Sequence, residues 1–263
     1  MSIPYYHVDV FTTEIFAGNP AGVCICSAFP SAETMQRIAV ENRHSETAFV
    51  VQRPDRQFDL RWFTPKVEDD LCGHATLAAG FVLDRRAYPD WPLVFHTRSG
   101  ALTVDRDGDG FAMDFPARPP QTCEPSSELF AALGLSRGTM MRSLRDYMVV
   151  VDSVDAVRRV SPDLARLERL ESGIGGVIVT AAGTDGADYV CRFFPPAVGI
   201  AEDPATGSIQ CTLAPYWAGV LGKETLSVRQ LSTRGGAMRC QVKDDRVMIS
   251  GAARLYLQGS IEL

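Results

Sequence analysis

Two side chains suited to proton transfer stand out in the first half of this 263-residue chain. Glu46 leads directly into the apolar run 47–51. A carboxylate at the mouth of a buried strand can have a raised pKa, which suits a general base. His74 stands at the start of a predicted helix, where the helix dipole favours a neutral imidazole that donates or accepts a hydrogen bond. A solvated strand-end glutamate and an ordinary polar cap are the alternatives at these two positions.

Two further polar side chains occupy a similar place in the second half. Asp203 comes just before a second predicted helix, and an acid near a helix start is also favoured by the helix dipole alone. Ser208 stands at the predicted first turn, as a cap or as a donor toward a developing oxyanion.

Each of the two predicted helices begins at a glycine, Gly73 or Gly207. A helix start carries unsatisfied N–H groups and a partial positive charge, so it binds anions, and glycine lets a ligand approach the backbone closely. Either start alone is ordinary. As a pair in a chain that repeats part of itself, as described below, they predict a site in which both starts face one carboxylate or enolate.

The chain repeats part of itself. Residues 61–65 (RWFTP) recur as residues 192–196 (RFFPP) at an offset of 131, and the acidic stretch, glycine and small-residue helix pattern of 68–78 recur at 202–211. Gly73 then matches Gly207, and His74 matches Ser208, at an offset of 134. Two matches in register favour duplication over chance similarity. We predict lobes at 1–117 and 118–263, with a linker at 117–121 and a last strand, 253–257, that can cross back to the first lobe.

The local patterns predict an α+β fold in each half. Alternation and turn residues predict strands, and helical periodicity predicts helices, one of them interrupted by Pro215. The predicted helices are 31–41, 74–88, 126–133, 155–160, 163–171 and 208–221. The predicted strands are 6–11, 21–27, 46–52, 58–64, 92–97, 101–106, 110–115, 146–152, 176–181 and 189–194, followed by further strands to the end.

Composition narrows the classes of partner. The formal net charge is −6, and a mildly acidic protein repels phosphate backbones, so we expect no nucleic-acid partner. The first residues show no basic segment followed by an apolar one, and no apolar run approaches the ~20 residues that span a bilayer. We therefore expect a cytoplasmic protein without a membrane partner.

The sequence carries none of the usual patterns for a bound metal or nucleotide cofactor. The seven cysteines are odd in number and lack C-x-x-C spacing, and the four histidines lack metal-ligand spacing. No P-loop and no G-x-G-x-x-G turn is present. We expect neither a metal nor a cofactor. Cys72, next to a predicted helix start, is either a reactive thiol or a packed small side chain.

Several segments resemble the phenazine-biosynthesis PhzF-like isomerase family, which has the diaminopimelate-epimerase-like fold. They are Gly18-Asn19-Pro20, Ser45-Glu46-Thr47-Ala48-Phe49, Phe63-Thr64-Pro65, Cys72-Gly73-His74-Ala75-Thr76-Leu77 and Glu202-Asp203-Pro204-Ala205-Thr206-Gly207-Ser208. The resemblance implies two pseudo-symmetric lobes, each a barrel-like mixed sheet around a central helix. It also implies a homodimer that works without metal or cofactor.

The resemblance also implies roles for individual residues. Glu46 would be the general acid/base, and His74, Asp203 and Ser208 would hold and polarise a small carboxylate-bearing substrate. The implied substrate-binding positions are Asn19, Ser45, Cys72, Gly73, Thr206 and Gly207.

Two departures leave the substrate open. Cys72-Gly73-His74-Ala75 stands where phenazine-pathway members have Ala-Gly-His-Pro, and Gln230 is followed by Leu231 rather than by the family's glycine. We predict an isomerase that moves a proton within its substrate. The alternatives are an amino-acid epimerase or other proton-abstracting lyase, and a binding protein without catalysis. A retained Glu46 argues against the last, because binding alone does not need a base there.

Overall fold

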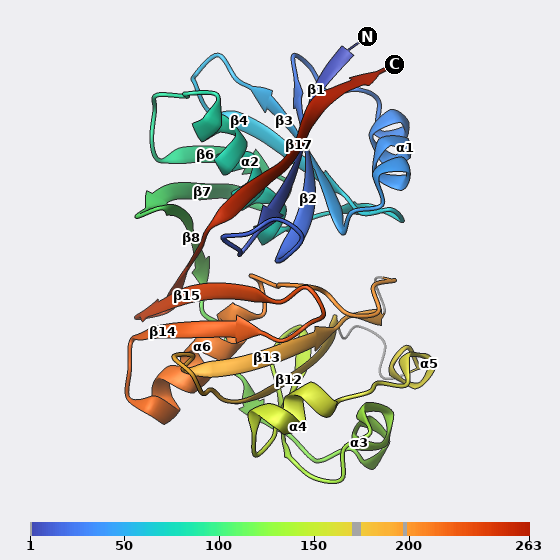
Figure 1. Cartoon of the computed structure of the whole chain (residues 1–263), viewed down its shortest axis with the longest axis vertical. Coiled ribbons are helices and arrows are strands. Elements are labelled where there is room, and N and C mark those ends of the chain that lie inside the picture. The colour runs from blue at the N-terminus through green and yellow to red at the C-terminus, as the bar shows by residue number, and fades with distance from the viewer. Residues whose placement is uncertain (1, 170–174, 197–198) are drawn as a thin grey trace. The chain divides into compact units, whose positions relative to one another are not determined.

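The computed structural model describes residues 2–169, 175–196 and 199–263, and it divides the chain into two α+β units. Unit 1 is Met1–Asp114 together with Met248–Leu263, and unit 2 is Phe115–Val247. The last strand, β17 (Ala253–Glu262), pairs antiparallel with the first, β1 (Ser2–Val10), as Figure 1 shows. The second unit therefore ends at Val247, and the last strand returns to the first unit, as the sequence allowed.

Unit 1 is a mixed sheet whose strands alternate between antiparallel and parallel neighbours. β1 is antiparallel to β2, β2 is parallel to β3, β3 is antiparallel to β4, and β4 is parallel to β6. The strands are β2 (Asn19–Cys26), β3 (Glu46–Gln52), β4 (Phe58–Phe63), β5 (Glu68–Asp69), β6 (Leu93–Thr97), β7 (Gly100–Asp107) and β8 (Gly110–Pro116). Helix α1 (Ala32–Asn42) makes the crossover from β2 to β3, and the Ser31 hydroxyl caps it by accepting from Thr34 N.

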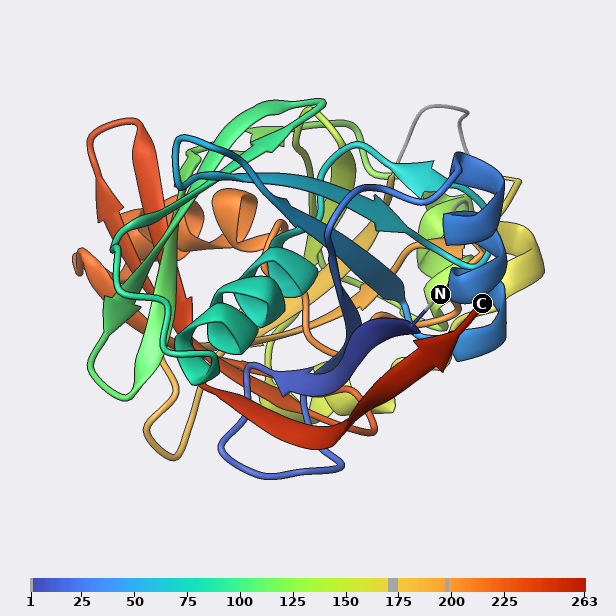
Figure 2. The same cartoon turned by 90° about the horizontal axis from the view of Figure 1, so that it is seen from above.

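Helix α2 (Gly73–Arg85) is the central helix of unit 1. It packs against β1, β2, β3 and β7, and Figure 2 shows it enclosed by strands of this unit. Small side chains allow this close approach: a Cβ added at Gly80 would lie only 2.8 Å from Val104 Cγ1. Ten of its residues are buried, so almost every face of the helix is covered, as the sequence predicts.

Unit 2 repeats the same alternation. β10 is antiparallel to β11, β11 is parallel to β12, β12 is antiparallel to β13, and β13 is parallel to β14. The strands are β9 (Gln121–Thr122), β10 (Thr139–Arg142), β11 (Asp146–Val150), β12 (Gly176–Ala182), β13 (Tyr189–Phe194), β14 (Thr225–Gln230) and β15 (Gly236–Lys243). Strand β16 (Arg246–Gly251) begins in unit 2 and continues into the segment of unit 1 that starts at Met248. The helices are α3 (Ser127–Leu133), α4 (Val154–Arg159), α5 (Leu164–Leu167) and α6 (Gln210–Leu221). Of the predicted helix 163–171, residues 170 and 171 lie outside the described residues.

The same ion pair recurs in both units and supports the predicted duplication. Arg61 donates from Nε and Nη2 to the two carboxylate oxygens of Glu68, at 2.6 and 2.8 Å. Arg192 does the same to Glu202, at 2.7 and 2.9 Å. Each guanidinium also lies over the phenylalanine ring two residues further along the chain, at 5.3 and 4.9 Å. Each pair fixes the loop that leads to the next helix.

Helix α6 begins later than predicted. It starts at Gln210, so Gly207 and Ser208 lie in the preceding turn and not in the helix. Gln210 N donates to Gly207 O at 2.9 Å and Cys211 N to Ser208 O at 3.3 Å, which are the i to i+3 bonds of a tight turn. The prediction that both helices begin at a glycine is therefore correct for α2 and wrong for α6.

Pro215 lies inside α6, where it cannot donate to the carbonyl of Cys211. The backbone N–H of Arg118 donates to that carbonyl instead, at 2.7 Å. The predicted adjustment around Pro215 thus includes a hydrogen bond from the linker segment. Among the described residues, no helix has the length and apolar character needed to cross a membrane.

Candidate active site

Glu46 and His74 lie side by side in unit 1. Glu46 is the first residue of β3, and His74 is the second residue of α2. Glu46 Oε2 and His74 Nε2 are 3.2 Å apart, and the two residues are only 8% and 6% exposed. Two residues distant in sequence therefore form a buried pair because β3 and the central helix start at the same end of the unit.

Burial keeps the His74 imidazole neutral. It lowers the pKa of His74 from 6.5 to about 3, helped by the nearby charge of His44 and opposed by a hydrogen bond to the backbone of Pro20. The neutral ring was expected from the helix start, but desolvation is the main cause. A neutral imidazole next to Glu46 adds no positive charge that would weaken the carboxylate as a base.

The second ring nitrogen of His74 faces two other side chains. Cys72 Sγ and Asn19 Nδ2 each lie 3.5 Å from Nδ1. Ser45 Oγ donates to Asn19 Oδ1 at 3.0 Å, and this bond turns the Asn19 amide nitrogen toward the ring. Thus Ser45, Asn19, His74 and Glu46 form one polar cluster, with Cys72 at its edge.

The start of α2 belongs to the same cluster. Cys72 is its N-cap residue, and the Cys72 side chain makes no capping hydrogen bond to the helix. Gly73, the first helical residue, is buried and carries no side chain. The N–H groups at this end can thus bind an anion beside the Glu46–His74 pair.

The predicted site residues of unit 2 lie in one buried loop. Asp203 and Thr206 are each 7% exposed, and Thr206 Oγ1 donates to Asp203 Oδ2. Gln230, at the end of β14, accepts from Thr206 N at 2.8 Å and donates to Asp203 O at 2.6 Å. Gly207 and the half-buried Ser208 follow in the turn before α6.

Comparison with known proteins identifies the family. A profile described as phenazine biosynthesis-like protein (PhzC-PhzF) matches residues 8–259. The chain belongs to the PhzF family. An uncharacterized isomerase of Pseudomonas aeruginosa is 47% identical over the full length of both chains. The phenazine biosynthesis-like domain-containing protein 2 of Mus musculus is 37% identical over 99% of each chain.

Solved structures agree with this assignment. A PhzF-family phenazine biosynthesis protein of Enterococcus faecalis is 42% identical, with a TM-score of 0.93 and full coverage of both chains. A probable proline racemase of Agrobacterium radiobacter is 12% identical, with a TM-score of 0.67 over 99% of this chain and 93% of its own. That second likeness concerns the fold alone. The two-lobed, diaminopimelate-epimerase-like α+β fold implied by the sequence is therefore confirmed.

The structure of this PhzF-family chain gathers the predicted residues into two groups. The first is Asn19, Ser45, Glu46, Cys72, Gly73 and His74 in unit 1, and the second is Asp203, Thr206, Gly207 and Ser208 in unit 2. The roles assigned to both groups stay predictions.

Two neighbours of these groups escaped sequence reasoning. Gln230 is 1% exposed and holds the Asp203 loop, although the sequence only suggested a change in substrate preference there. The alternation of residues in β14 could have indicated Gln230. Its buried positions alternate, Gln230 falls on the buried face, and a buried amide needs hydrogen-bond partners. His44, which lowers the pKa of His74, accepts or donates a 2.9 Å hydrogen bond with Tyr5 OH.

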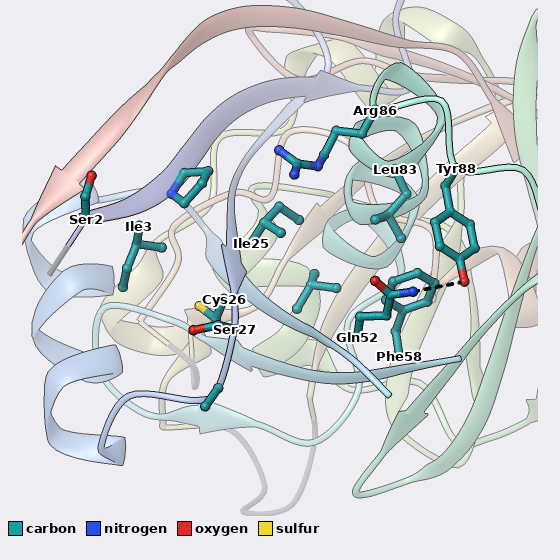
Figure 3. A pocket seen from close by; sticks show the side chains of 13 residues that line it. Ser2, Ile3, Ile25, Cys26, Ser27, Gln52, Phe58, Leu83, Arg86 and Tyr88 are labelled. Carbon is teal, nitrogen blue, oxygen red and sulfur yellow. Dashed lines mark hydrogen bonds between the residues drawn. The ribbon is translucent and has the colours of Figure 1, made fainter. Parts of the chain in front are cut away.

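A separate pocket of about 520 Å³ lies at the opposite ends of β2, β3 and α2 (Figure 3). Cys26, Gln52, Leu83 and Arg86 contribute to its wall. None of the predicted site residues lines it, and a helix rise of ~1.5 Å per residue puts Arg86 about 18 Å along α2 from His74. In this PhzF-family chain the pocket is therefore separate from the site around Glu46 and His74.

Proposed function

We propose that the chain catalyses proton transfer within a small carboxylate-bearing substrate, without metal or cofactor, with Glu46 as the general acid/base. The observation that carries this proposal is the buried contact of Glu46 Oε2 with the neutral His74, at 3.2 Å. Membership of a PhzF family with relatives named isomerases supports the reaction class.

Glu46 does the chemistry in this proposal. Its carboxylate takes a proton from a substrate carbon, the C–H bond breaks, and the electron pair shifts into conjugation with an acidifying group of the substrate. The protonated Glu46 then returns the proton to a different carbon of the same molecule, so no oxidant or co-reactant is needed. His74 positions the carboxylate from one side, and as a neutral ring it places no positive charge beside it.

The substrate carboxylate binds, in this proposal, at the start of α2. The N–H groups after Cys72 and the helix dipole favour an anion there, and Gly73 has no side chain to block a ligand. Asn19, Ser45 and Cys72 bind the same substrate from the surrounding cluster.

We assign Asp203, Thr206, Gly207 and Ser208 to holding and polarising the substrate as well. Supporting this role, the Asp203 carboxylate is buried and its loop is fixed by two hydrogen bonds with Gln230, one accepted from Thr206 N and one donated to Asp203 O. A fixed loop presents its polar groups without a reorganisation cost, which is what transition-state stabilisation requires.

Epimerisation of an amino acid is the second candidate, and one observation favours it. The Cys72 thiol lies 3.5 Å from His74 Nδ1, so a second proton-carrying group stands next to the first. At the offset of 134, however, the counterpart of Cys72 is Thr206, which is no thiol. A single glutamate base therefore accounts better for the composition of the site.

The test is proton exchange followed by NMR in deuterated water. Wild type, Glu46→Gln and the control Glu41→Gln, an exposed glutamate on α1, are incubated with dihydroanthranilates and α-amino acids. We expect Glu46→Gln to lower the exchange rate ~10²–10⁴-fold and Glu41→Gln to leave it unchanged. Equal exchange in wild type and Glu46→Gln would reject Glu46 as the base.

The labelling pattern separates the candidate functions. Deuterium together with a shifted double bond indicates isomerisation, and deuterium at a stereocentre without that shift indicates epimerisation. Binding without exchange of any compound would favour the binding-protein alternative. The homodimer and the cytoplasmic location are further proposals, and light scattering of the purified chain tests the first.

A further inference from the structure

Three different metal-ligand types meet beside the start of α2. Glu46 offers a carboxylate oxygen, Cys72 a sulfur and His74 an imidazole nitrogen, and one such atom from each lies within 4.8 Å of the other two. All three residues are buried. The sequence hides this set, because Cys72 and His74 are two residues apart while Glu46 comes from a different strand.

We propose that Glu46, Cys72 and His74 bind a thiophilic divalent cation such as Zn²⁺, and that this cation inhibits proton transfer by occupying the acid/base. The binding is independent of the proposed function, whereas the inhibition rests on it. The cation is an inhibitor in this proposal and takes no part in the reaction.

One pair of donor atoms already has the separation that zinc requires. Zinc is bound at about 2.3 Å by sulfur and about 2.0–2.2 Å by nitrogen or oxygen in a tetrahedron, which puts ligand atoms roughly 3.3–3.6 Å from one another. Cys72 Sγ and His74 Nδ1 already lie 3.5 Å apart. Glu46 Oε2 lies 3.2 Å from the other ring nitrogen, Nε2, so the Glu46 side chain must move toward Nδ1 for all three ligands to reach one cation. Three protein ligands leave the fourth position for water or an anion.

The charges of the three ligands suit a doubly charged cation. His74 is a neutral ligand, the Cys72 thiol loses one proton to solvent as the metal–sulfur bond forms, and Glu46 binds as a carboxylate. The two negative charges then balance the cation in a buried site, where an uncompensated charge would be costly. Because thiolate is a soft ligand, the site selects zinc or cadmium over magnesium and calcium.

Unit 2 offers no second site of this kind at the matching positions. At the offset of 134, Cys72 corresponds to Thr206 and His74 to Ser208, and neither hydroxyl replaces a thiolate or an imidazole. We therefore expect one thiolate-bound cation per chain. A Glu46 carboxylate that is bound to the metal cannot accept a substrate proton. The exchange rate should therefore fall in proportion to the fraction of chains that hold the cation.

The test of binding uses the metal-stripped full-length protein and Co²⁺ as a spectroscopic probe for zinc, without any substrate. A thiolate ligand gives Co²⁺ an intense ultraviolet charge-transfer band. We expect this band in wild type, saturating at one Co²⁺ per chain and disappearing when Zn²⁺ displaces the cobalt. It should persist in Cys123→Ser, a control thiol of intermediate exposure in unit 2, and vanish in both Cys72→Ala and Cys72→Ser.

Competition with a chromophoric chelator measures the zinc affinity itself. Changing a residue that only supports a metal ligand typically lowers metal affinity ~10–100-fold. We expect His74→Asn and both Cys72 variants, which remove a ligand itself, to lower the zinc affinity by at least that factor. Absence of the band in wild type, or a band of equal strength in Cys72→Ala, would overturn the proposal.

The exchange assay separates this inference from the proposed function. If wild type exchanges substrate protons but shows no thiolate band, the metal site is wrong and the function stands. If the band forms and no substrate exchanges, the function is wrong and the binding site stands. If both occur, saturating Zn²⁺ must lower the wild-type rate more than that of Cys72→Ala, each relative to its own metal-free rate. Equal inhibition would overturn the inhibitory role.

Discussion

The two units share a framework but place different side chains on it. In both, an Arg–Glu pair fixes the loop before the central helix: Arg61 with Glu68, and Arg192 with Glu202. The strand register extends the comparison. Thr47 pairs with Phe63 and Val177 with Phe194, so Glu46 in unit 1 corresponds to Gly176 in unit 2.

Unit 2 has no space for a base at that position. A Cβ added to Gly176 would lie 2.7 Å from the ring of Phe193 and 2.8 Å from the Phe194 carbonyl oxygen. These distances are shorter than van der Waals contact, and one of the two neighbours is a backbone atom that cannot rotate away. A glutamate at position 176 would therefore require β12 to move. The duplicated framework therefore holds a Glu–His pair in unit 1 alone.

The two helix starts differ as well. Helix α2 begins at Gly73, directly after Cys72, whereas α6 begins three residues after Gly207 through a tight turn. Unit 2 thus presents a hydrogen-bonded loop with Asp203, and unit 1 presents a buried helix start without a side-chain cap. In the proposed function this is a division of work: unit 1 supplies the base together with binding groups, and unit 2 supplies binding groups only.

The largest expected effect compares the two carboxylates. Glu46→Gln should lower kcat for proton exchange ~10²–10⁴-fold, because the base is lost. Asp203→Asn should act mainly on KM and retain more of kcat, since Asp203 is assigned to binding. Steady-state kinetics of both variants check this. If Asp203→Asn abolished kcat while Glu46→Gln kept it, the division of work would be reversed.

The second prediction concerns stability toward acid. The pKa of His74 is about 3 in the folded chain against about 6.5 unfolded, so the unfolded state binds more protons between these values. The contribution of His74 is therefore fully present above pH 6.5 and is lost as pH falls toward 3, at up to about 1.4 kcal/mol per pH unit. Urea unfolding across this range should show a shallower pH slope in His74→Asn than in wild type. Equal slopes would contradict the burial of an ionisable His74.

Asp146 in unit 2 should show the opposite sign. Burial raises the pKa of Asp146 from 3.8 to about 6, opposed by the charges of Arg145 and Arg118 and by a hydrogen bond from the Gly176 backbone. The folded state then binds more protons than the unfolded state between pH 6 and 3.8, so this group adds stability as pH falls through that window. Asp146→Asn should remove this gain in the same unfolding series. An unchanged pH dependence would show that Asp146 titrates normally.

A smaller effect tests the space around Gly176 and Gly219 in unit 2. Gly176→Ala should destabilise the protein by ~1–3 kcal/mol, because its Cβ meets Phe193 and the Phe194 carbonyl. Gly219→Ala is the matched control: it lies within α6 with nothing within 4 Å of the added Cβ, so it should stabilise by ~0.4–1 kcal/mol. Thermal unfolding of the two variants checks the sign of each change. Stabilisation by Gly176→Ala would restore the possibility of a side chain there.

Local pattern was enough for much of this fold. The strand 46–52 was predicted with its observed bounds, since it is a short apolar run, and Ser31 caps α1 as expected. Long-range strand pairing could not be predicted in this way. Strand β17 pairs with β1, about the whole chain length away, and an alternating pattern does not indicate which strand will be the partner.

The candidate site shows the same limit. Residue types marked Glu46 and His74 as suited to proton transfer, but their 3.2 Å contact depends on where β3 and α2 start in the assembled unit. The late start of α6 and the role of Gln230 depend likewise on tertiary hydrogen bonds. Thr206 N and the Asp203 carbonyl become partners of Gln230 only once β14 lies beside the loop.

The smallest effect compares the repeated arginines. Lysine keeps the charge but loses the planar fork that binds a carboxylate through two N–H groups. Arg192 also donates to the carbonyls of Val157, Arg158 and Val160 at the end of α4, whereas Glu68 keeps a second partner in Arg98 when Arg61 is changed. Arg61→Lys should therefore cost about 1 kcal/mol and Arg192→Lys about 1 kcal/mol more, measured by urea unfolding. A larger cost at Arg61 would mean that the shared ion pair is held more tightly in unit 1, and that the α4 carbonyls contribute little to unit 2.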